Sequence, residues 1–310
     1  MATIPVDIVD AFAERPFTGN PAAIVPDASS LDLSDMLRIT DELQMEAGFV
    51  LPPATPEADI RLRFFTPLRE AMLSGHVIVA AFISLAERGL FQPTRVGTRL
   101  HYETGVGLLP VVLTTAENGC TLVTFDLPPP RFGEPVPASE VAAALHLPAE
   151  CLKLHDHRPQ RVSCGSDVLV VPITDYNAAR GAFTDKEAIR RLADQRGVGG
   201  VACFCPEATT PGTDLFCRFF YPSDGTDEDV VSGTSLGAIA AYCLDKGMLP
   251  RAERVSISTE QGHALGRPNR AVIDVCMSGP CVTKISLTAT GAVVLRGEFQ
   301  LHQETAVAFR

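Results

Sequence analysis

The chain has 310 residues, of which 46% are hydrophobic and 20% charged, as in an ordinary globular protein large enough to form two domains. Its net charge of −11 argues against a nucleic-acid partner, because phosphate binding requires a basic surface. The N-terminus lacks the features of a signal peptide, and the longest apolar run, residues 77–86, is too short to span a membrane. Nine cysteines without a repeating pattern favour reduced thiols and a cytoplasmic location.

Short apolar or alternating segments recur along the whole chain, separated by turn residues. They predict strands, while Ser34 is expected to cap a helix that runs to about Gln44. Many short strands and few helices predict an α+β protein rather than a doubly wound parallel sheet. The expected strands are residues 6–12, 22–25, 46–51, 60–65, 99–103, 108–114, 121–127, 254–258, 271–276 and 283–287.

One strand–helix unit stands out in the first half of the chain. The strand at 60–65 is followed by Gly75, His76 and an apolar run at 77–83 that has no polar face. A helix of this composition is expected to be buried on all sides. The free N–H groups of its first turn carry partial positive charge and suit an anion.

The same unit occurs a second time. The segment that starts at Arg218 precedes Ser232, Gly233 and an apolar helix at 236–244, and Arg218 lies 155 residues after Arg63. Because this spacing is half of the 310 residues, we interpret the chain as two similar domains. Coincidence between two unrelated strand–helix units is the alternative.

Metal and nucleophile chemistry are poorly supported by the sequence. Cys203 and Cys205 lie in an apolar segment and His155 and His157 in a polar one, without the paired spacing of a zinc site. No Gly-x-Ser-x-Gly elbow is present. The serines that precede the two helix-starting glycines, Ser74 and Ser232, are interpreted as helix caps.

Acid–base chemistry remains. Glu46 stands between Met45 and Ala47, an apolar neighbourhood that favours the neutral acid and suits a proton shuttle. His76 could polarise a substrate, and Glu228-Asp229 could position a polar ligand. Each has a structural alternative: a solvated carboxylate, a core histidine and a charged loop.

Four ordered phrases are spread over most of the chain. They are Asp10-Ala11-Phe12 with Gly19-Asn20-Pro21-Ala22; Arg63, Phe65-Thr66-Pro67, Glu70 and Gly75-His76; Phe220, Pro222, Gly225, Glu228-Asp229 and Gly233-Thr234; and Gln261-Gly262 with Gly266-Arg267-Pro268. With these phrases the chain resembles a known family, the PhzF-like phenazine-biosynthesis isomerases, relatives of diaminopimelate epimerase and proline racemase. The family usually has Ser before its active-site Glu and Thr after it, where this chain has Met45 and Ala47.

The resemblance implies a diaminopimelate epimerase-like fold of two pseudo-symmetric domains, residues 1–117 with 295–310 and residues 118–294. Each domain is expected to be a barrel-like mixed sheet around one central helix, and the two helix N-termini to face a cleft between the domains. The resemblance also implies catalysis without cofactor or metal, and a homodimer. The catalytic residues that it implies are Glu46, His76 and Asp229, and the substrate-binding residues are Ser74, Gly75, Ser232, Gly233 and Thr234.

The residues before the two glycines favour one reaction class. The epimerase and racemase branches place a Cys at each position, whereas this chain has Ser74 and Ser232, whose hydroxyls are too weakly acidic to act unaided as bases. We therefore expect an isomerase in which Glu46 moves a proton on one face of a small carboxylate-bearing molecule. A lyase or hydrolase using the same base, or a non-catalytic binding protein, remains the alternative.

Overall fold

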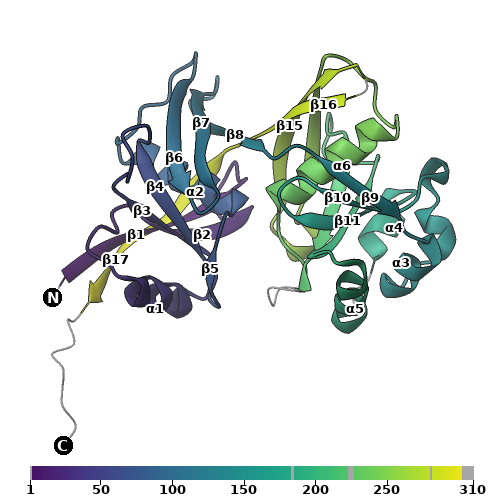
Figure 1. The fold of residues 1–310 in the computed structure, drawn as a ribbon, viewed down its shortest axis with the longest axis horizontal. Coiled ribbons are helices and arrows are strands. Elements are labelled where there is room, and N and C mark those ends of the chain that lie inside the picture. The colour runs from purple at the N-terminus through teal and green to yellow at the C-terminus, as the bar shows by residue number, and fades with distance from the viewer. Residues whose placement is uncertain (1, 183–184, 223–226, 280, 302–310) are drawn as a thin grey trace, which may run out of the picture. The chain divides into compact units, whose positions relative to one another are not determined.

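The computed structural model describes residues 2–182, 185–222, 227–279 and 281–301, and its chain forms two compact units (Figure 1). The first unit comprises Met1–Phe17, Pro21–Val123 and Thr290–Arg310, and the second Thr18–Asn20 and Thr124–Ala289. Strands dominate both units, so the protein is α+β as predicted. Among the described helices, none is both long enough and apolar enough to cross a membrane.

The first unit is a mixed sheet with two helices. Strand β1 pairs antiparallel with β17, β2 runs parallel to β3, β3 antiparallel to β4, and β4 parallel to β6. Its elements are β1 (Ala2–Ala11), β2 (Asn20–Val25), α1 (Leu33–Leu43), β3 (Ala47–Leu51), β4 (Ile60–Phe65), β5 (Glu70–Ala71), α2 (Gly75–Glu87), β6 (Thr98–Thr104), β7 (Gly107–Thr115) and β17 (Gly291–Leu301).

The second unit repeats this order with additional helices. Strand β11 runs parallel to β12, β12 antiparallel to β13, and β13 parallel to β14. After β8 (Thr121–Leu127), its elements are β9 (Arg131–Pro135), α3 (Ala138–Ala144), the short helices η1 (Ala149–Leu152) and η2 (Leu154–Asp156), β10 (Gln160–Ser163), β11 (Asp167–Pro172), α4 (Tyr176–Gly181), α5 (Lys186–Arg196), β12 (Gly200–Cys205), β13 (Leu215–Phe220), α6 (Gly233–Asp245), β14 (Arg254–Gln261), η4 (His263–Leu265), β15 (Asn269–Ser278) and β16 (Cys281–Ala289).

The pairing pattern supports the repeat inferred from spacing. In each unit a helix connects two parallel strands, α1 between β2 and β3 and α5 between β11 and β12. A longer helix then connects the next parallel pair, α2 between β4 and β6 and α6 between β13 and β14. Both of these helices have 13 residues and begin after a serine, Ser74 or Ser232. Coincidence between unrelated segments does not account for this order.

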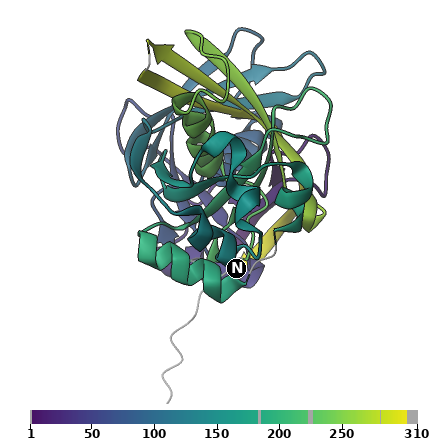
Figure 2. The ribbon, with the colours of Figure 1, turned by 90° about the vertical axis from the view of Figure 1, so that its right-hand side faces the viewer.

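Helices α2 and α6 are the cores of their units. Every α2 residue from His76 to Leu85 is buried, and α6 is buried from Ser235 to Leu244. Helix α2 packs against β1, β3 and β17 (Figure 1), whereas α6, in green, packs against β10, β11, β12, β15 and β16 (Figures 1 and 2). A helix without a polar face is stable in water only when strands cover it all round, as predicted for residues 77–83.

The cap predicted for α1 is wrong by two residues. The helix begins at Leu33, and the Asp32 carboxylate accepts a hydrogen bond from the Asp35 N–H, with a reciprocal bond from the Asp32 N–H to the Asp35 side chain. Asp32 has the extended backbone that a cap requires, whereas Ser34 already lies inside the helix.

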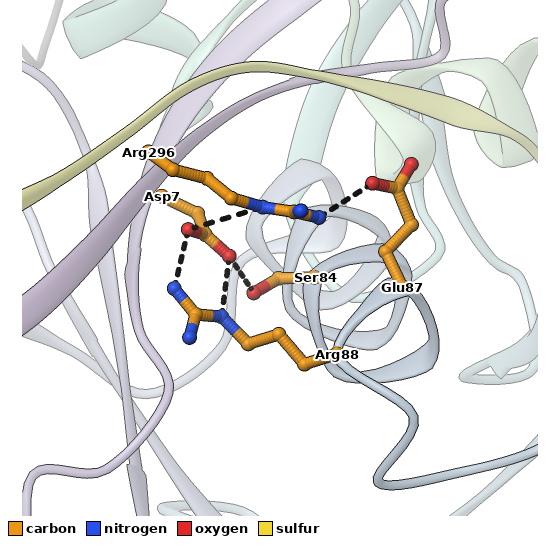
Figure 3. Close-up of polar contacts among 5 residues, drawn as sticks. All are labelled: Asp7, Ser84, Glu87, Arg88 and Arg296. Carbon is orange, nitrogen blue, oxygen red and sulfur yellow. Dashed lines mark hydrogen bonds and ion pairs between the residues drawn. The ribbon is translucent and has the colours of Figure 1, made fainter.

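A buried charge network holds the C-terminal end of α2 to the sheet (Figure 3). The Asp7 carboxylate is fully buried and accepts hydrogen bonds from Arg88 Nε and Nη2 at 2.8 and 2.6 Å and from Ser84 Oγ at 2.6 Å. Arg296, opposite Asp7 on β17, lies 3.9 Å from the same carboxylate and pairs with Glu87. Burial alone would raise the pKa of Asp7, but these hydrogen bonds and the nearby guanidinium charges outweigh it and lower the pKa. The network thus fixes α2 at the end remote from Gly75.

We expect Asp7→Asn to lower the free energy of unfolding by about 2 kcal/mol at pH 7, because charged hydrogen bonds to a buried acceptor are lost. Arg88 and Arg296 are partly exposed, which keeps the loss below that of a fully buried pair. A lowered pKa stabilises the fold above the carboxyl's unfolded pKa, and this contribution disappears as the pH falls through the folded pKa. The difference between Asp7→Asn and wild type in the free energy of urea unfolding should therefore shrink below about pH 4.

The exposed partner in the same network provides the control: Glu87→Gln should lower the free energy of unfolding by less than about 1 kcal/mol. An equal cost for both variants would contradict this account.

Candidate active site

Glu46 is fixed at a sharp junction between α1 and β3. The helix ends at Leu43 and is capped by Gln44, whose backbone is left-handed with φ of 51°, and the strand begins at Ala47. The Glu46 carbonyl accepts a hydrogen bond from the Ala23 N–H at 2.9 Å, which anchors the residue to β2. The Glu46 side chain retains 33% exposure. It is therefore less desolvated than its apolar sequence neighbours suggest.

The start of α2 lies beside this carboxylate. Ser74 Oγ donates to Glu46 Oε2 at 2.7 Å and lies 3.3 Å from His76 Nδ1. His76 Nε2 lies 3.8 Å from Glu46 Oε2, and the His76 side chain is 10% exposed. Because the Ser74 hydroxyl has one hydrogen and gives it to Glu46, the contact with His76 requires an N–H on His76 Nδ1. Glu46, Ser74 and His76 thus form one cluster.

The structure corrects one of the two predicted serine caps. Ser74 occupies the N-cap position of α2 but makes no capping hydrogen bond, because its hydroxyl is directed to Glu46. Ser232 does cap α6, accepting from the Ser235 N–H at 3.4 Å. The first N–H groups of each helix, including those of Gly75 and Gly233, have no acceptor in their own helix and can bind an anion.

The start of α6 carries a chain of hydroxyl groups. Ser232 Oγ lies 3.2 Å from Thr234 Oγ1, which lies 2.7 Å from Ser166 Oγ. Sequence reasoning missed Ser166, because no motif marks it and its contact with Thr234 spans 68 residues. The chain holds polar groups next to Gly233, where a ligand can approach the backbone without meeting a Cβ.

Glu228 and Asp229 differ in their environments. The Glu228 carboxylate is buried and paired with Arg218, with Nε–Oε1 and Nη2–Oε2 distances of 2.9 and 2.8 Å. The expectation that Glu228 positions a ligand is therefore wrong, because its oxygens are engaged inside the protein. Asp229 is partly exposed; its N–H donates to the Phe219 carbonyl at 2.8 Å, and its Oδ1 accepts from Asn20 Nδ2 at 2.8 Å. Gly225, part of the same phrase, lies outside the described residues.

The cysteine and histidine pairs do not form a metal centre. Cys203 and Cys205 lie in the buried strand β12, and burial raises the pKa of each thiol to about 12. His155 and His157 lie near η2 with ring centroids 6.5 Å apart. Within the described part of the chain, no group of three or more His, Cys, Asp or Glu side chains could hold a metal ion.

We expect the cysteines to be dispensable for catalysis. Five of the nine are buried, and only Cys281 is exposed, so iodoacetamide should reach Cys281 first and then the half-buried thiols. Because none belongs to the Glu46–Ser74–His76 cluster, native alkylation followed by mass spectrometry should leave turnover largely intact. Loss of activity that follows modification of a single cysteine, with an unchanged fold, would contradict this.

The mixed two-unit fold, with one long buried helix in each unit, is shared by a solved structure of the PhzF family, and relatives of the chain are named isomerases. A family model described as phenazine biosynthesis-like protein matches residues 9–297, so the chain belongs to that family. This confirms the resemblance drawn from the four sequence phrases.

Relatives and solved structures agree with this assignment. An uncharacterized isomerase of Deinococcus radiodurans is 31% identical, over 93% of this chain and 92% of its own. The trans-2,3-dihydro-3-hydroxyanthranilate isomerase of Pseudomonas aeruginosa is 27% identical, over 95% of this chain and 98% of its own. The crystal structure of a Bacillus anthracis phenazine biosynthesis protein of the PhzF family matches with a TM-score of 0.87 and 28% identity, covering 97% of this chain and 100% of that one.

The wider superfamily shares the fold. A hydroxyproline epimerase from Agrobacterium vitis matches with a TM-score of 0.62 at 13% identity, over 96% of this chain and 91% of that one. The predicted epimerase-like fold is confirmed by these two structures, and the isomerase class by the family model and the relatives that are named isomerases.

Proposed function

We propose that the protein is an isomerase that moves a proton within a small carboxylate-bearing molecule, with Glu46 as the single acid–base group. The observation that carries this proposal is the Glu46–Ser74–His76 cluster at the start of α2. A partly exposed carboxylate that accepts one hydroxyl hydrogen keeps other lone pairs with which to take a substrate proton.

The reaction uses one face of the substrate. Glu46 removes a proton from one carbon, becomes a carboxylic acid, and returns the proton to another atom of the same molecule. Ser74 and His76 hold the carboxylate in place, and the free backbone N–H groups at the start of α2 can stabilise negative charge that develops on the substrate. Because serines precede both glycines, the two-thiol chemistry of the epimerase branch has no counterpart here.

The remaining residues suit a small acid with a neighbouring donor group. The N–H groups that begin each buried helix, at Gly75 in the first unit and at Gly233-Thr234 in the second, favour a carboxylate. Ser232 and Thr234 can donate to a ligand at the start of α6. Asp229 repels a carboxylate, so we assign it to an amine or hydroxyl of the substrate. These groups bind the substrate, and Glu46 supplies the proton transfer.

The test measures proton exchange directly. Trans-2,3-dihydro-3-hydroxyanthranilate, the compound named for the Pseudomonas relative, and a panel of small hydroxy and amino acids are incubated with the protein in D2O and followed by proton NMR. We expect deuterium incorporation and an isomeric product of equal mass apart from deuterium. Loss of water or a fragment would indicate a lyase or hydrolase, and tight binding without exchange would indicate a binding protein.

A further inference from the structure

Two of the sequence phrases have no role in the proton transfer described above. They are Gly19-Asn20-Pro21 and the segment from Gln261 to Pro268. Although residues 18–20 are flanked in sequence by the first unit, they belong to the second, where they lie against the segment Asp229–Val231. Both phrases contact this segment, which leads into the start of α6.

The Asn20 side chain binds Asp229 directly. Asn20 Nδ2 donates to Asp229 Oδ1 at 2.8 Å and to the Val231 carbonyl at 3.1 Å. Because both partners are acceptors, the amide nitrogen must face them, and both of its hydrogens are used. A hydrogen bond to a carboxylate is charge-assisted and therefore stronger than one between neutral groups.

Arg267 holds the backbone on which Asn20 lies. Its Nε donates to the Gly19 carbonyl at 2.7 Å, and its Nη2 donates to the Thr18 carbonyl at 3.1 Å. The guanidinium thereby fixes the turn that precedes Asn20. A neutral side chain on a fixed turn can orient a partner more precisely than one on a free loop.

Two further amides hold the neighbouring carbonyls. Gln261 Nε2 donates to the Asp229 carbonyl at 2.9 Å, and Asn269 Nδ2 donates to the Val230 carbonyl at 2.9 Å. Both side chains are almost completely buried. Together with Asn20 they bind the carbonyls of three consecutive residues, and we call these three side chains the amide frame.

Close backbone packing supports the frame. Gly262, between Gln261 and Asn269, has φ of +79°, and a Cβ there would lie 2.3 Å from the Arg267 carbonyl oxygen and 2.7 Å from Asn269 Nδ2. Only glycine fits this position without strain. The Gln-Gly and Gly-Arg-Pro phrases thus supply Gln261 and Arg267 and the close packing at Gly262 that supports the frame.

We propose that Asn20 is a positioning residue for Asp229. The amide frame holds the Asp229 carboxylate in the orientation in which it accepts a hydrogen bond from the donor group of the substrate. This inference rests on the proposed function, in which Asp229 contacts the substrate. The nearby charged side chains include Glu228, which pairs with Arg218, and Arg267, which donates to the carbonyls of Thr18 and Gly19. Asn20 acts on Asp229 as a neutral donor.

The first experiment needs no substrate. Thermal melting of Asn20→Asp is compared with that of Asn20→Ala at pH 8 and pH 5. At pH 8 the Asp side chain places a second carboxylate oxygen beside Asp229 Oδ1, and we expect it to melt several degrees below Asn20→Ala. At pH 5 a shared proton restores a donor, and the difference should close. The matched control is Asn118→Asp. Asn118 lies on an exposed turn, where its side-chain oxygen accepts a hydrogen bond from the Cys120 N–H, so this variant should melt like wild type at both pH values.

A swapped pair tests the contact itself. Asn20→Asp with Asp229→Asn reverses donor and acceptor, so it should recover part of the melting temperature at pH 8, the Val231 carbonyl limiting the recovery. If Asn20→Asp melts like Asn20→Ala at both pH values and the swap recovers nothing, the frame is wrong.

Turnover tests the positioning role separately. Asn20→Ala should lower kcat/KM roughly 10- to 100-fold through misplacement of Asp229, with little further loss in an Asp229→Asn background. Full activity of Asn20→Ala alongside an impaired Asp229→Asn would overturn the positioning role. Full activity of Asp229→Asn would instead remove Asp229 from the proposed function, whereas the melting experiments would still decide whether the frame exists.

Discussion

Replacing Glu46 by Gln should lower kcat by about 10²–10⁴, the usual contribution of general acid–base catalysis. The amide has the shape of the carboxylate but cannot take a proton, and its oxygen can still accept from Ser74 Oγ, which lies 2.7 Å away in the wild type. The fold should therefore survive, as circular dichroism and thermal melting would show. Solvent-deuterium incorporation should fall in parallel with turnover, because both require the same base.

The matched control lies on the preceding helix. Glu42 is exposed on α1, four residues before Glu46, and Glu42→Gln removes the same charge without touching the cluster. Its kcat should equal that of wild type. Near-wild-type turnover of Glu46→Gln on a verified substrate would remove Glu46 as the proton carrier.

The second large effect concerns the repeated arginine. Arg218→Met should lower the free energy of unfolding by about 3–5 kcal/mol, the cost of leaving one member of a buried ion pair without its partner. The side chains of Arg218 and Glu228 are each 8% exposed. Arg218 also donates to the carbonyls of Ala179, Arg180 and Ala182, which connects β13 to the end of α4. Urea unfolding monitored by far-UV circular dichroism measures the loss.

The first unit supplies the matched control. Arg63 pairs with Glu70 and lies over the Phe65 ring at 5.2 Å, as Arg218 lies over Phe220 at 4.7 Å. The Arg63 and Glu70 side chains are 21% and 42% exposed, so solvent screens the pair, and Arg63→Met should cost less than about 1 kcal/mol. Adding Glu228→Gln to Arg218→Met removes the uncompensated charge and should restore part of the stability. Equal losses at Arg63 and Arg218 would contradict the burial argument.

Much of the fold could be predicted from local patterns. The run at 77–83 indicated a helix without a polar face, and the structure buries that helix from His76 to Leu85. The spacing between Arg63 and Arg218 indicated a repeat, and the strand pairings follow the same order in both units. The cap of α1 was missed because Asp32 and Ser34 are equally suitable residue types, and only the backbone angles distinguish them.

The site depended more on contacts that no local pattern encodes. Glu46 and Ser74 are 28 residues apart, and their hydrogen bond follows from the packing of β3 against α2, where a Cβ on Gly48 would lie 2.6 Å from Val77 Cγ1. Asn20 and Asp229 are 209 residues apart. Glu228 looked like a loop carboxylate, because its partner Arg218 lies ten residues earlier in a strand. Sequence motifs identified these residues as important, but the tertiary fold decides which side chains meet.

The pairing of β1 with β17 has a consequence for how the protein is made. These strands join residues 2–11 to residues 291–301, so the sheet around α2 closes with segments from opposite ends of the chain. During synthesis, the edge of β1 that pairs with β17 stays unpaired until residues 291–301 have left the ribosome. The second unit, by contrast, is contiguous from 124 to 289 apart from residues 18–20. Long-range pairing of this kind slows folding and exposes apolar surface in the meantime. We therefore expect the nascent N-terminal half to expose apolar surface until residues 291–301 have been synthesised.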